Sequence, residues 1–147
     1  MPVDPRCRES FDRQGLMTLL GAELVEAADG RAAIEVPYRE DLTQQHGYFH
    51  GGVVTVIADT ACGYAAYTTM PEDSSVLTVE FKINLVNPAA GDRLRAEATV
   101  RKAGRTLVVV AATVFAIRDE KSVACGEMLG TFIVLRDTSD VQPRVLA

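Results

Sequence analysis

The chemically most informative residue of the sequence is a single carboxylate in an apolar segment. Residues 51–69 contain one charged side chain, Asp59, which follows His50 by nine residues. Aspartate forms helices poorly and is rarely buried without a partner. Two interpretations are open: a structural carboxylate that pairs with a neighbouring strand, or a catalytic carboxylate whose pKa is raised by apolar surroundings. A catalytic carboxylate would act as a general base or a nucleophile, and the apolar flanks favour this interpretation.

Two glycines, Gly51 and Gly52, stand at the expected start of the same helix. Backbone N–H groups of a first turn have no partner within the helix, and the helix dipole favours a negative oxygen there. Because glycine has no side chain, a substrate can come close. Such a terminus can polarise a carbonyl group and stabilise an oxyanion. A tight turn into a buried helix would use the same residues, so both interpretations stay open.

The spacing of Gly51 and Asp59 has a geometric consequence. A helix rises 1.5 Å per residue, so the two residues are separated by ~12 Å along the axis. Groups that act on one carbonyl must converge to within about 3 Å of it. One chain cannot meet this requirement, whereas two chains with antiparallel helices can. The spacing therefore predicts at least a homodimer in which each site draws on both subunits.

The elements expected around these residues form an α+β domain. The helix over residues 51–69 is apolar on nearly all sides, so it must be buried on nearly all sides. A shorter helix is expected over residues 9–21. Alternating apolar residues, turn residues and a valine-rich run predict strands over residues 22–28, 31–38, 77–85, 92–102, 106–117 and 123–135. The 106–117 run is typical of a strand covered on both faces. We expect a mostly antiparallel sheet wrapped around one long central helix.

Composition narrows the function classes. The chain of 147 residues has the length of one domain, with an expected core over residues 11–135 and a loosely held polar tail over residues 136–147. A net charge of −5 argues against a nucleic-acid partner. The longest apolar run is too short for a membrane helix, which needs roughly 20 residues, and the N-terminal residues do not suggest a signal peptide. Cys7, Cys62 and Cys125 have no metal-ligand spacing and are expected to be reduced thiols of a cytoplasmic protein.

The motif His50-Gly51-Gly52, with Asp59 and then Thr60-Ala61 after it, resembles the signature of PaaI-type hotdog-fold acyl-CoA thioesterases. The resemblance covers roughly residues 11–135. It implies a hotdog fold, no cofactor, no metal ion, and a homodimer or a dimer of dimers. It also implies that Asp59 is the general base or nucleophile of thioester hydrolysis. The Gly51 or Gly52 N–H of the other subunit would polarise the carbonyl, and His50 would orient the loop or contact the thioester.

Two positions depart from the family pattern or extend it. Many relatives have asparagine six residues before the motif histidine, where this chain has Gln44, and Gln45 and His46 are alternative candidates for that role. A hydroxyl group that places water in some relatives aligns with Thr78. The alternation of its strand puts Thr78 on the polar side and does not indicate whether that side faces Asp59.

Substrate binding is assigned to two further groups. Tyr48 and Phe49 either line an acyl pocket or anchor the loop, and His46 is more often a loop hydrogen-bonding residue than a catalyst. Coenzyme A carries phosphates, and the best candidates for a local basic site are Arg101, Lys102 and Arg105, which otherwise form an ordinary solvated turn. A hydratase or dehydratase acting on acyl thioesters and a non-enzymatic acyl-CoA-binding protein remain the alternatives to a thioesterase.

Overall fold

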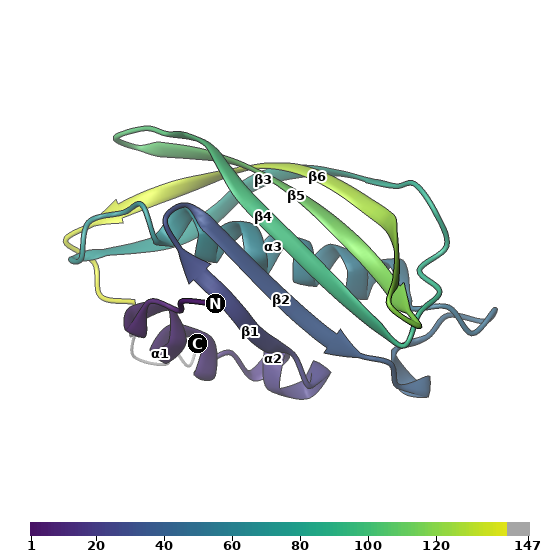
Figure 1. Ribbon diagram of the computed structural model, residues 1–147. Helices are drawn as coiled ribbons and strands as arrows, with labels where there is room; N and C mark the ends of the chain where they lie inside the picture. Colours follow the sequence, from purple (N-terminus) through teal and green to yellow (C-terminus); the bar gives the residue numbers. More distant parts are fainter. Residues whose placement is uncertain (141–147) are drawn as a thin grey trace, which may run out of the picture.

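The computed structural model describes residues 1–140 of the chain. Six strands form one antiparallel sheet in the order β1-β2-β4-β5-β6-β3, and the sheet curves around a long helix (Figure 1). The strands are β1 (Glu23–Ala28), β2 (Arg31–Pro37), β3 (Ser74–Leu85), β4 (Arg93–Ala103), β5 (Leu107–Arg118) and β6 (Lys121–Arg136). The helices are α1 (Pro5–Asp12), α2 (Gly15–Leu20) and α3 (Gly51–Tyr67), with a short 3-10 turn η1 at Glu40–Leu42. This arrangement confirms the expected α+β hotdog fold.

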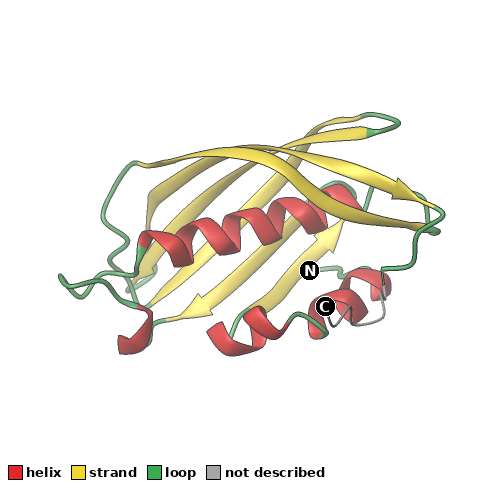
Figure 2. Cartoon of the chain, turned by 180° about the vertical axis from the view of Figure 1, so that it is seen from behind, coloured by secondary structure: helices red, strands yellow, loops and turns green. Residues whose placement is uncertain are grey.

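Helix α3 lies along the concave side of the sheet and contacts all six strands (Figure 2). Its small and apolar residues allow this close approach, and nine of its side chains are buried. The helix ends at Tyr67, two residues earlier than expected. The Arg6 guanidinium caps this end by donating to the carbonyls of Tyr67 and Pro71 at 2.8 and 2.7 Å. A cation at a helix C-terminus is favourable because it meets the unpaired carbonyls and the dipole. No helix within residues 1–140 is long and apolar enough to cross a membrane.

The N-terminal region forms two helices where one was expected over residues 9–21. The first begins at Pro5, with the Asp4 carboxylate accepting from the Arg6 backbone N–H at 2.8 Å as an N-cap. The chain bends at Arg13 and Gln14, and α2 then ends at Gly21 with a positive φ of 66°. Proline and the capping aspartate explain the earlier start. The bend places Gln14 between the two helices, next to α3.

A β-bulge in β3 corrects the expected alternation of that strand. The register against β6 shifts between Thr78 and Glu80. Thr78 pairs with Phe132, and beyond the bulge Phe81 pairs with Gly130. Phe132 and Gly130 are buried residues on the α3 side of β6, so the bulge gives Thr78 and Phe81 the same face although their numbers differ by three. Thr78 therefore points to the helix, which strict alternation could not predict.

Strand β5 and the C-terminal tail also differ from expectation. Strand β5 alternates between buried residues on the concave face and half-buried residues on the convex face, so it is not fully covered on both faces. Strand β3 lies at one edge of the sheet, and its outer edge has no strand partner among residues 1–140. Of the expected loose tail, Arg136 belongs to β6 and Asp140 is held by Arg13 and Ser75. The rest of that tail, residues 141–147, lies outside the described part of the chain.

Candidate active site

Asp59 lies half-buried in the third turn of α3 and faces β3. Its Oδ1 accepts a hydrogen bond from the Thr78 hydroxyl at 2.8 Å, and its Oδ2 has no partner within residues 1–140. Burial raises the pKa of the Asp59 carboxyl group above its ordinary value, and the hydrogen bond from Thr78 opposes part of this rise. No cation of the described chain forms an ion pair with Asp59, so the salt-bridge form of the structural interpretation does not apply.

A cavity of about 170 Å³ opens beside this carboxylate. It is lined by Ser10, Gln14, Asp59, Thr60, Gly63, Tyr64, Val76, Thr78, Phe132 and Asp140. Cys62 is adjacent on the helix but fully buried, and its burial raises the pKa of the thiol to about 12. A thiol with so high a pKa is almost entirely protonated at neutral pH. The other carboxylate that lines the cavity, Asp140, is paired with Arg13 at 2.9 Å. Asp59 is therefore the basic or nucleophilic group available among the described residues of this cavity.

The N-terminus of α3 presents a second set of groups. His50 is the N-cap residue, and its Nδ1 accepts from the Gly52 N–H at 2.8 Å. The Gly51 N–H has no acceptor among residues 1–140. Of the two expected carbonyl-polarising donors, the one at Gly52 is thus occupied and the one at Gly51 is available. This cap is compatible with the expected role of His50 in orienting the loop, and its expected contact with the thioester stays a prediction.

Gln44 lies beside this helix terminus in a cavity of about 420 Å³. The cavity is lined by Gln44, Tyr48, Phe49, Gly51, Val54, Leu85, Val86, Asn87, Pro88, Ala89 and Cys125. The Gln44 Oε1 accepts from the His46 backbone N–H, which orients the amide so that its NH₂ group has no acceptor in the described chain. Tyr48 and Phe49 line this cavity, and Phe49 is also anchored edge-on against Tyr38 at 5.4 Å. Both expected roles of Phe49 are compatible with this position.

The two cavities share no lining residue. Asp59 and Thr78 belong to one, while Gln44 and Gly51 belong to the other. Within one chain the groups expected to act on a single carbonyl are therefore divided between two places, as the ~12 Å axial separation requires. Each cavity holds half of the expected catalytic set.

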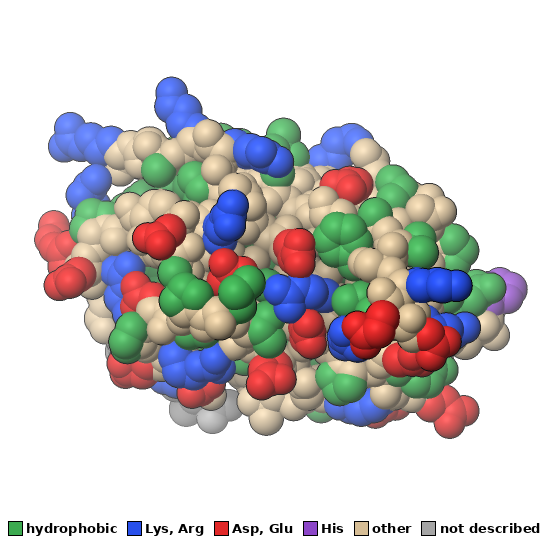
Figure 3. All heavy atoms as spheres, in the orientation of Figure 1, with side chains coloured by type: hydrophobic (Ala, Val, Ile, Leu, Met, Phe, Trp, Pro, Cys, Tyr) green, Lys and Arg blue, Asp and Glu red, His purple; other side chains and the backbone are tan. Residues whose placement is uncertain are grey.

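The remaining expected residues lie away from both cavities. His46 is exposed in the loop before α3 and lines neither of them. Arg101, Lys102 and Arg105 are exposed on the hairpin between β4 and β5, where lysine and arginine side chains gather (Figure 3, upper left). The Arg105 carbonyl accepts from the Arg136 guanidinium at 3.0 Å.

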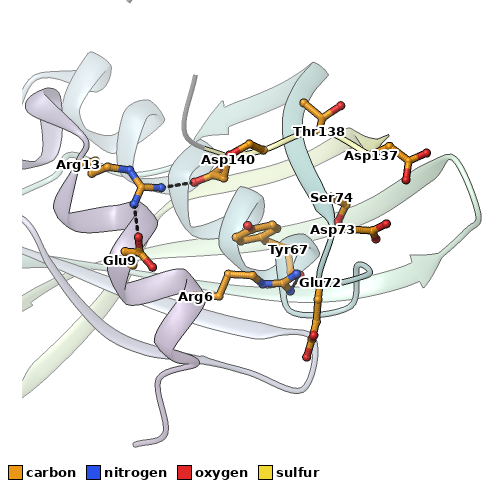
Figure 4. Close-up of a pocket in the computed structure, with 11 residues that line it drawn as sticks. Arg6, Glu9, Arg13, Tyr67, Glu72, Asp73, Ser74, Asp137, Thr138 and Asp140 are labelled. Carbon is orange, nitrogen blue, oxygen red and sulfur yellow. Dashed lines mark hydrogen bonds and ion pairs between the residues drawn. The ribbon is translucent and has the colours of Figure 1, made fainter. Parts of the chain in front are cut away.

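A larger cavity of about 460 Å³ lies between α1, the start of β3 and the C-terminal segment (Figure 4). Its charged residues are five acids and two arginines: Glu9, Glu72, Asp73, Asp137, Asp140, Arg6 and Arg13. The excess of acids is unsuited to a phosphate-bearing ligand. Both arginines have structural partners, Arg6 at the end of α3 and Arg13 with Glu9 and Asp140. No three His, Cys, Asp or Glu side chains within residues 1–140 are grouped as a metal site would need.

Ser10 and Gln14 are among the residues of the Asp59 cavity that the sequence did not reveal. Gln14 Nε2 donates to the Tyr64 hydroxyl at 2.8 Å, and that hydroxyl donates to Ser10 Oγ at 3.1 Å. These contacts join residues 50 and 54 positions apart in the chain. No local pattern reports such a pairing, because it depends on how α1 and α2 pack against α3.

Comparison with known proteins gives consistent matches. Residues 46–123 match the family described as the thioesterase superfamily. A thioesterase family protein from Silicibacter pomeroyi is 46% identical, with a TM-score of 0.87 and coverage of 89% of this chain and 96% of that one. A Bacillus halodurans protein solved with CoA is 27% identical, with a TM-score of 0.73 and coverage of 87% and 82%. The E. coli PaaI protein from the phenylacetic acid degradation operon is 21% identical, with a TM-score of 0.74 and coverage of 89% and 93%, and it shares the fold.

Proposed function

Since the chain belongs to the thioesterase superfamily and is a thioester hydrolase, we propose that it hydrolyses acyl-CoA at a site shared by two subunits. Asp59 of one subunit supplies the base or nucleophile, and the Gly51 N–H of the other polarises the thioester carbonyl. The observation that carries this proposal is a half-buried carboxylate with a raised pKa and one free oxygen beside a cavity. The relative solved with CoA supports the choice of thiol.

The chemistry follows from the positions of the donors. As a base, Asp59 takes a proton on Oδ2 from a water molecule whose oxygen attacks the carbonyl carbon. As a nucleophile, it attacks that carbon itself, and water then cleaves the resulting anhydride. In both routes the C–S bond breaks, the CoA sulfur is protonated, and a carboxylic acid is released. The Gly51 N–H stabilises the oxyanion, and the free Gln44 NH₂ is placed in the same cavity to assist. Thr78 holds Asp59 through Oδ1 and leaves Oδ2 for the reaction.

The surface of β3 supports the homodimer that this site needs. Leu77, Val79, Phe81 and Leu85 are 58, 53, 40 and 56% exposed along an edge strand of twelve residues. A long apolar edge with unpaired backbone groups promotes association with another chain. We propose that two β3 strands pair antiparallel about a twofold axis, which also makes the two α3 helices antiparallel. Pairing of dimers into a tetramer is part of the proposal and is tested by sedimentation at several protein concentrations.

Release of free thiol from a panel of acyl-CoA thioesters tests the activity. A thioesterase releases CoA with at least one member of the panel, in proportion to enzyme. A hydratase or dehydratase would change the acyl group's absorbance or mass and leave the thioester intact. A non-enzymatic binding protein would bind acyl-CoA without either change. Absence of thiol release across short, medium, branched and aromatic acyl groups would refute the proposal.

Mixed dimers test whether the site is shared. Gly51→Pro removes the proposed N–H donor, and proline is well tolerated at the first helical position. The preceding His50 already has the extended backbone, with ψ of 139°, that a following proline requires. Gly51→Ala is the matched control, since its added Cβ also displaces the Leu85 side-chain end but its N–H remains.

Gly51→Pro and Asp59→Asn subunits should each be nearly inactive alone. When they are unfolded together and refolded, half of the dimers are hybrids, and each hybrid has one site with both groups intact. Activity should then return to about a quarter of the wild-type value, because half of the dimers carry one working site of two. A mixture no more active than its parts would refute the shared site, provided that hybrids are detected by mass spectrometry.

A further inference from the structure

The Asp59 cavity ends in a polar wall that the hydrolytic chemistry does not use. Tyr64 is 3% exposed, and its hydroxyl group lies between Gln14 Nε2 at 2.8 Å and Ser10 Oγ at 3.1 Å. All three side chains line the cavity. The bond from Nε2 fixes the orientation of the Gln14 amide, and its Oε1 has no donor within residues 1–140. Ser10 accepts from Tyr64, so its own hydroxyl hydrogen is available.

The N-terminal helices hold this wall in place. Gln14 stands at the bend between α1 and α2, where its backbone N–H donates to Phe11 O at 2.9 Å. The neighbouring Arg13 is tied to Glu9 at 3.1 Å and to Asp140 at 2.9 Å. The Asp140 carboxylate also accepts from Ser75 Oγ at 3.0 Å. The polar wall is therefore built from one subunit and is fixed before any substrate enters.

We propose that Gln14, Ser10 and Tyr64 determine acyl-group specificity by binding a neutral hydroxyl or similar polar group at the far end of a compact acyl chain. The proposal rests on the proposed hydrolysis at Asp59. A hydroxyl group on the substrate donates to Gln14 Oε1 and accepts from the Ser10 hydroxyl. A terminal methyl group would instead cover these atoms and remove their water without replacing its hydrogen bonds. Sites of this kind discriminate against substrates that lack the polar group.

The size of the cavity limits the acyl group. Tyr64 follows Asp59 by five residues, which corresponds to ~7.5 Å along the helix. An extended six-carbon chain with a terminal hydroxyl spans a similar distance. The cavity of about 170 Å³ is close to the ~150 Å³ that accommodates one benzene ring in an engineered protein cavity. Gly63 leaves this space open, because a side chain there would extend from the helix into the cavity wall facing Phe132.

Charge excludes a carboxylate at the same position. Asp59 and Asp140 both line the cavity, and only Asp140 has a cationic partner there, Arg13 at 2.9 Å. An acyl chain that ends in a carboxylate would bring a third negative charge into this space. Like charges in a partly buried site repel strongly because water screens them poorly. The acceptable polar group is therefore a neutral one.

Three thioesters that differ only at the last carbon test the inference: hexanoyl-CoA, 6-hydroxyhexanoyl-CoA and adipoyl-CoA. For the wild-type protein, kcat/KM should be about tenfold higher for 6-hydroxyhexanoyl-CoA than for hexanoyl-CoA, and lowest for adipoyl-CoA. Tyr64→Phe and Gln14→Leu should each reduce the hydroxyl preference at least about threefold, mainly through the hydroxylated substrate. Tyr67→Phe is the matched control, because Tyr67 is buried on the same helix but lines the acidic cavity of Figure 4. It should leave the preference unchanged.

Binding separates this inference from the proposed activity. Calorimetry with Asp59→Asn protein measures the affinities of hexanoyl-CoA and 6-hydroxyhexanoyl-CoA without turnover, and Tyr64→Phe in the same background should remove the difference. If no thioester is hydrolysed but this binding preference is found, the proposed function is refuted and the proposed specificity of the polar wall is supported. Equal kcat/KM values and equal affinities for the two neutral thioesters would overturn the inference. A preference that Tyr67→Phe abolishes as fully as Tyr64→Phe would also overturn it.

Discussion

Replacing Asp59 with asparagine removes the charge and basicity of the side chain and keeps its shape. The asparagine carbonyl can still accept the 2.8 Å hydrogen bond that Thr78 now donates to Oδ1. The helix and the cavity should therefore keep their structure, and acyl-CoA should still bind. What disappears is the one carboxylate among the described cavity residues that has no cationic partner, since Asp140 is paired with Arg13, and with it the group that could take the proton of an attacking water at Oδ2 or attack the carbonyl itself.

The expected loss in kcat is a factor of about 10² to 10⁴, the range for removing a general base. It is measured by thiol release under saturating acyl-CoA, with binding to the variant checked by calorimetry. The pH profile of the wild-type enzyme supplies a second readout. Because burial raises the pKa of Asp59, activity should fall on the acid side at a pH above the ordinary aspartate value of about 4. Any residual activity of Asp59→Asn should lack this limb.

The effect of Asp59→Asn on stability should be opposite in sign to the effect of removing a structural salt bridge. A carboxyl group whose pKa is higher in the folded than in the unfolded state makes the folded state less stable once it ionises. This cost is absent below the unfolded value of about 4, grows as the pH rises through the folded pKa, and is constant above it. Asp59→Asn should therefore melt at or above the wild-type temperature at pH 7, and the difference should vanish near pH 3.5. A lower melting temperature at pH 7 with near-normal kcat would refute the catalytic assignment.

Five other substitutions, at three places, test neighbouring parts of the site. Thr78→Val removes the hydrogen bond that lowers the pKa of Asp59, so the acid limb of kcat/KM should move to higher pH, and an unmoved limb would contradict the assignment. Gly63→Ala should raise the free energy of unfolding by about 0.5–1 kcal/mol, because the new Cβ meets only Phe132 Cε1 at 3.8 Å. It should also lower kcat/KM more for hexanoyl-CoA than for acetyl-CoA. A lower melting temperature would show that the space beside Gly63 is not free. Neutralising Arg101, Lys102 or Arg105 to glutamine should raise KM more than it lowers kcat, as expected for contacts made equally in ground and transition states; KM values unchanged in all three variants would exclude the hairpin from CoA binding.

The sequence was sufficient to predict those parts of the fold and site that depend on interactions between residues close together in the chain. The central helix was foreseen over residues 51–69, two residues longer than the observed α3, because its composition leaves burial as the only possibility, and the carboxylate within it stood out for the same reason. The strand pattern gave the antiparallel sheet, since alternation and turn residues act over a few positions. The division of Gly51 and Asp59 between two places followed from the rise of a helix alone.

The other features of the site could not be predicted, because they depend on packing between residues far apart in the chain. The bulge after Thr78 depends on pairing with β6, so alternation within β3 could not show that Thr78 reaches Asp59. The sequence did not show that His50 caps the helix by accepting from the Gly52 N–H, because this contact depends on the geometry of the loop. Gln14 reaches Tyr64 only because the chain bends before α2, a detail that neither residue signals in its own neighbourhood.

Under the proposed mechanism, the N-terminus and the middle of α3 together explain why a small domain would keep a destabilising carboxylate in its central helix. An oxyanion donor needs an unpaired N–H, which a helix offers only in its first turn. A base with a raised pKa needs apolar surroundings, which the middle of the buried helix provides. One helix cannot place both on one carbonyl, but in the proposed dimer an antiparallel pair joined through the exposed edge of β3 would align the terminus of each helix with the middle of the other. The proposed arrangement thus accounts together for the apolar edge of β3, the divided cavities and the raised pKa of Asp59.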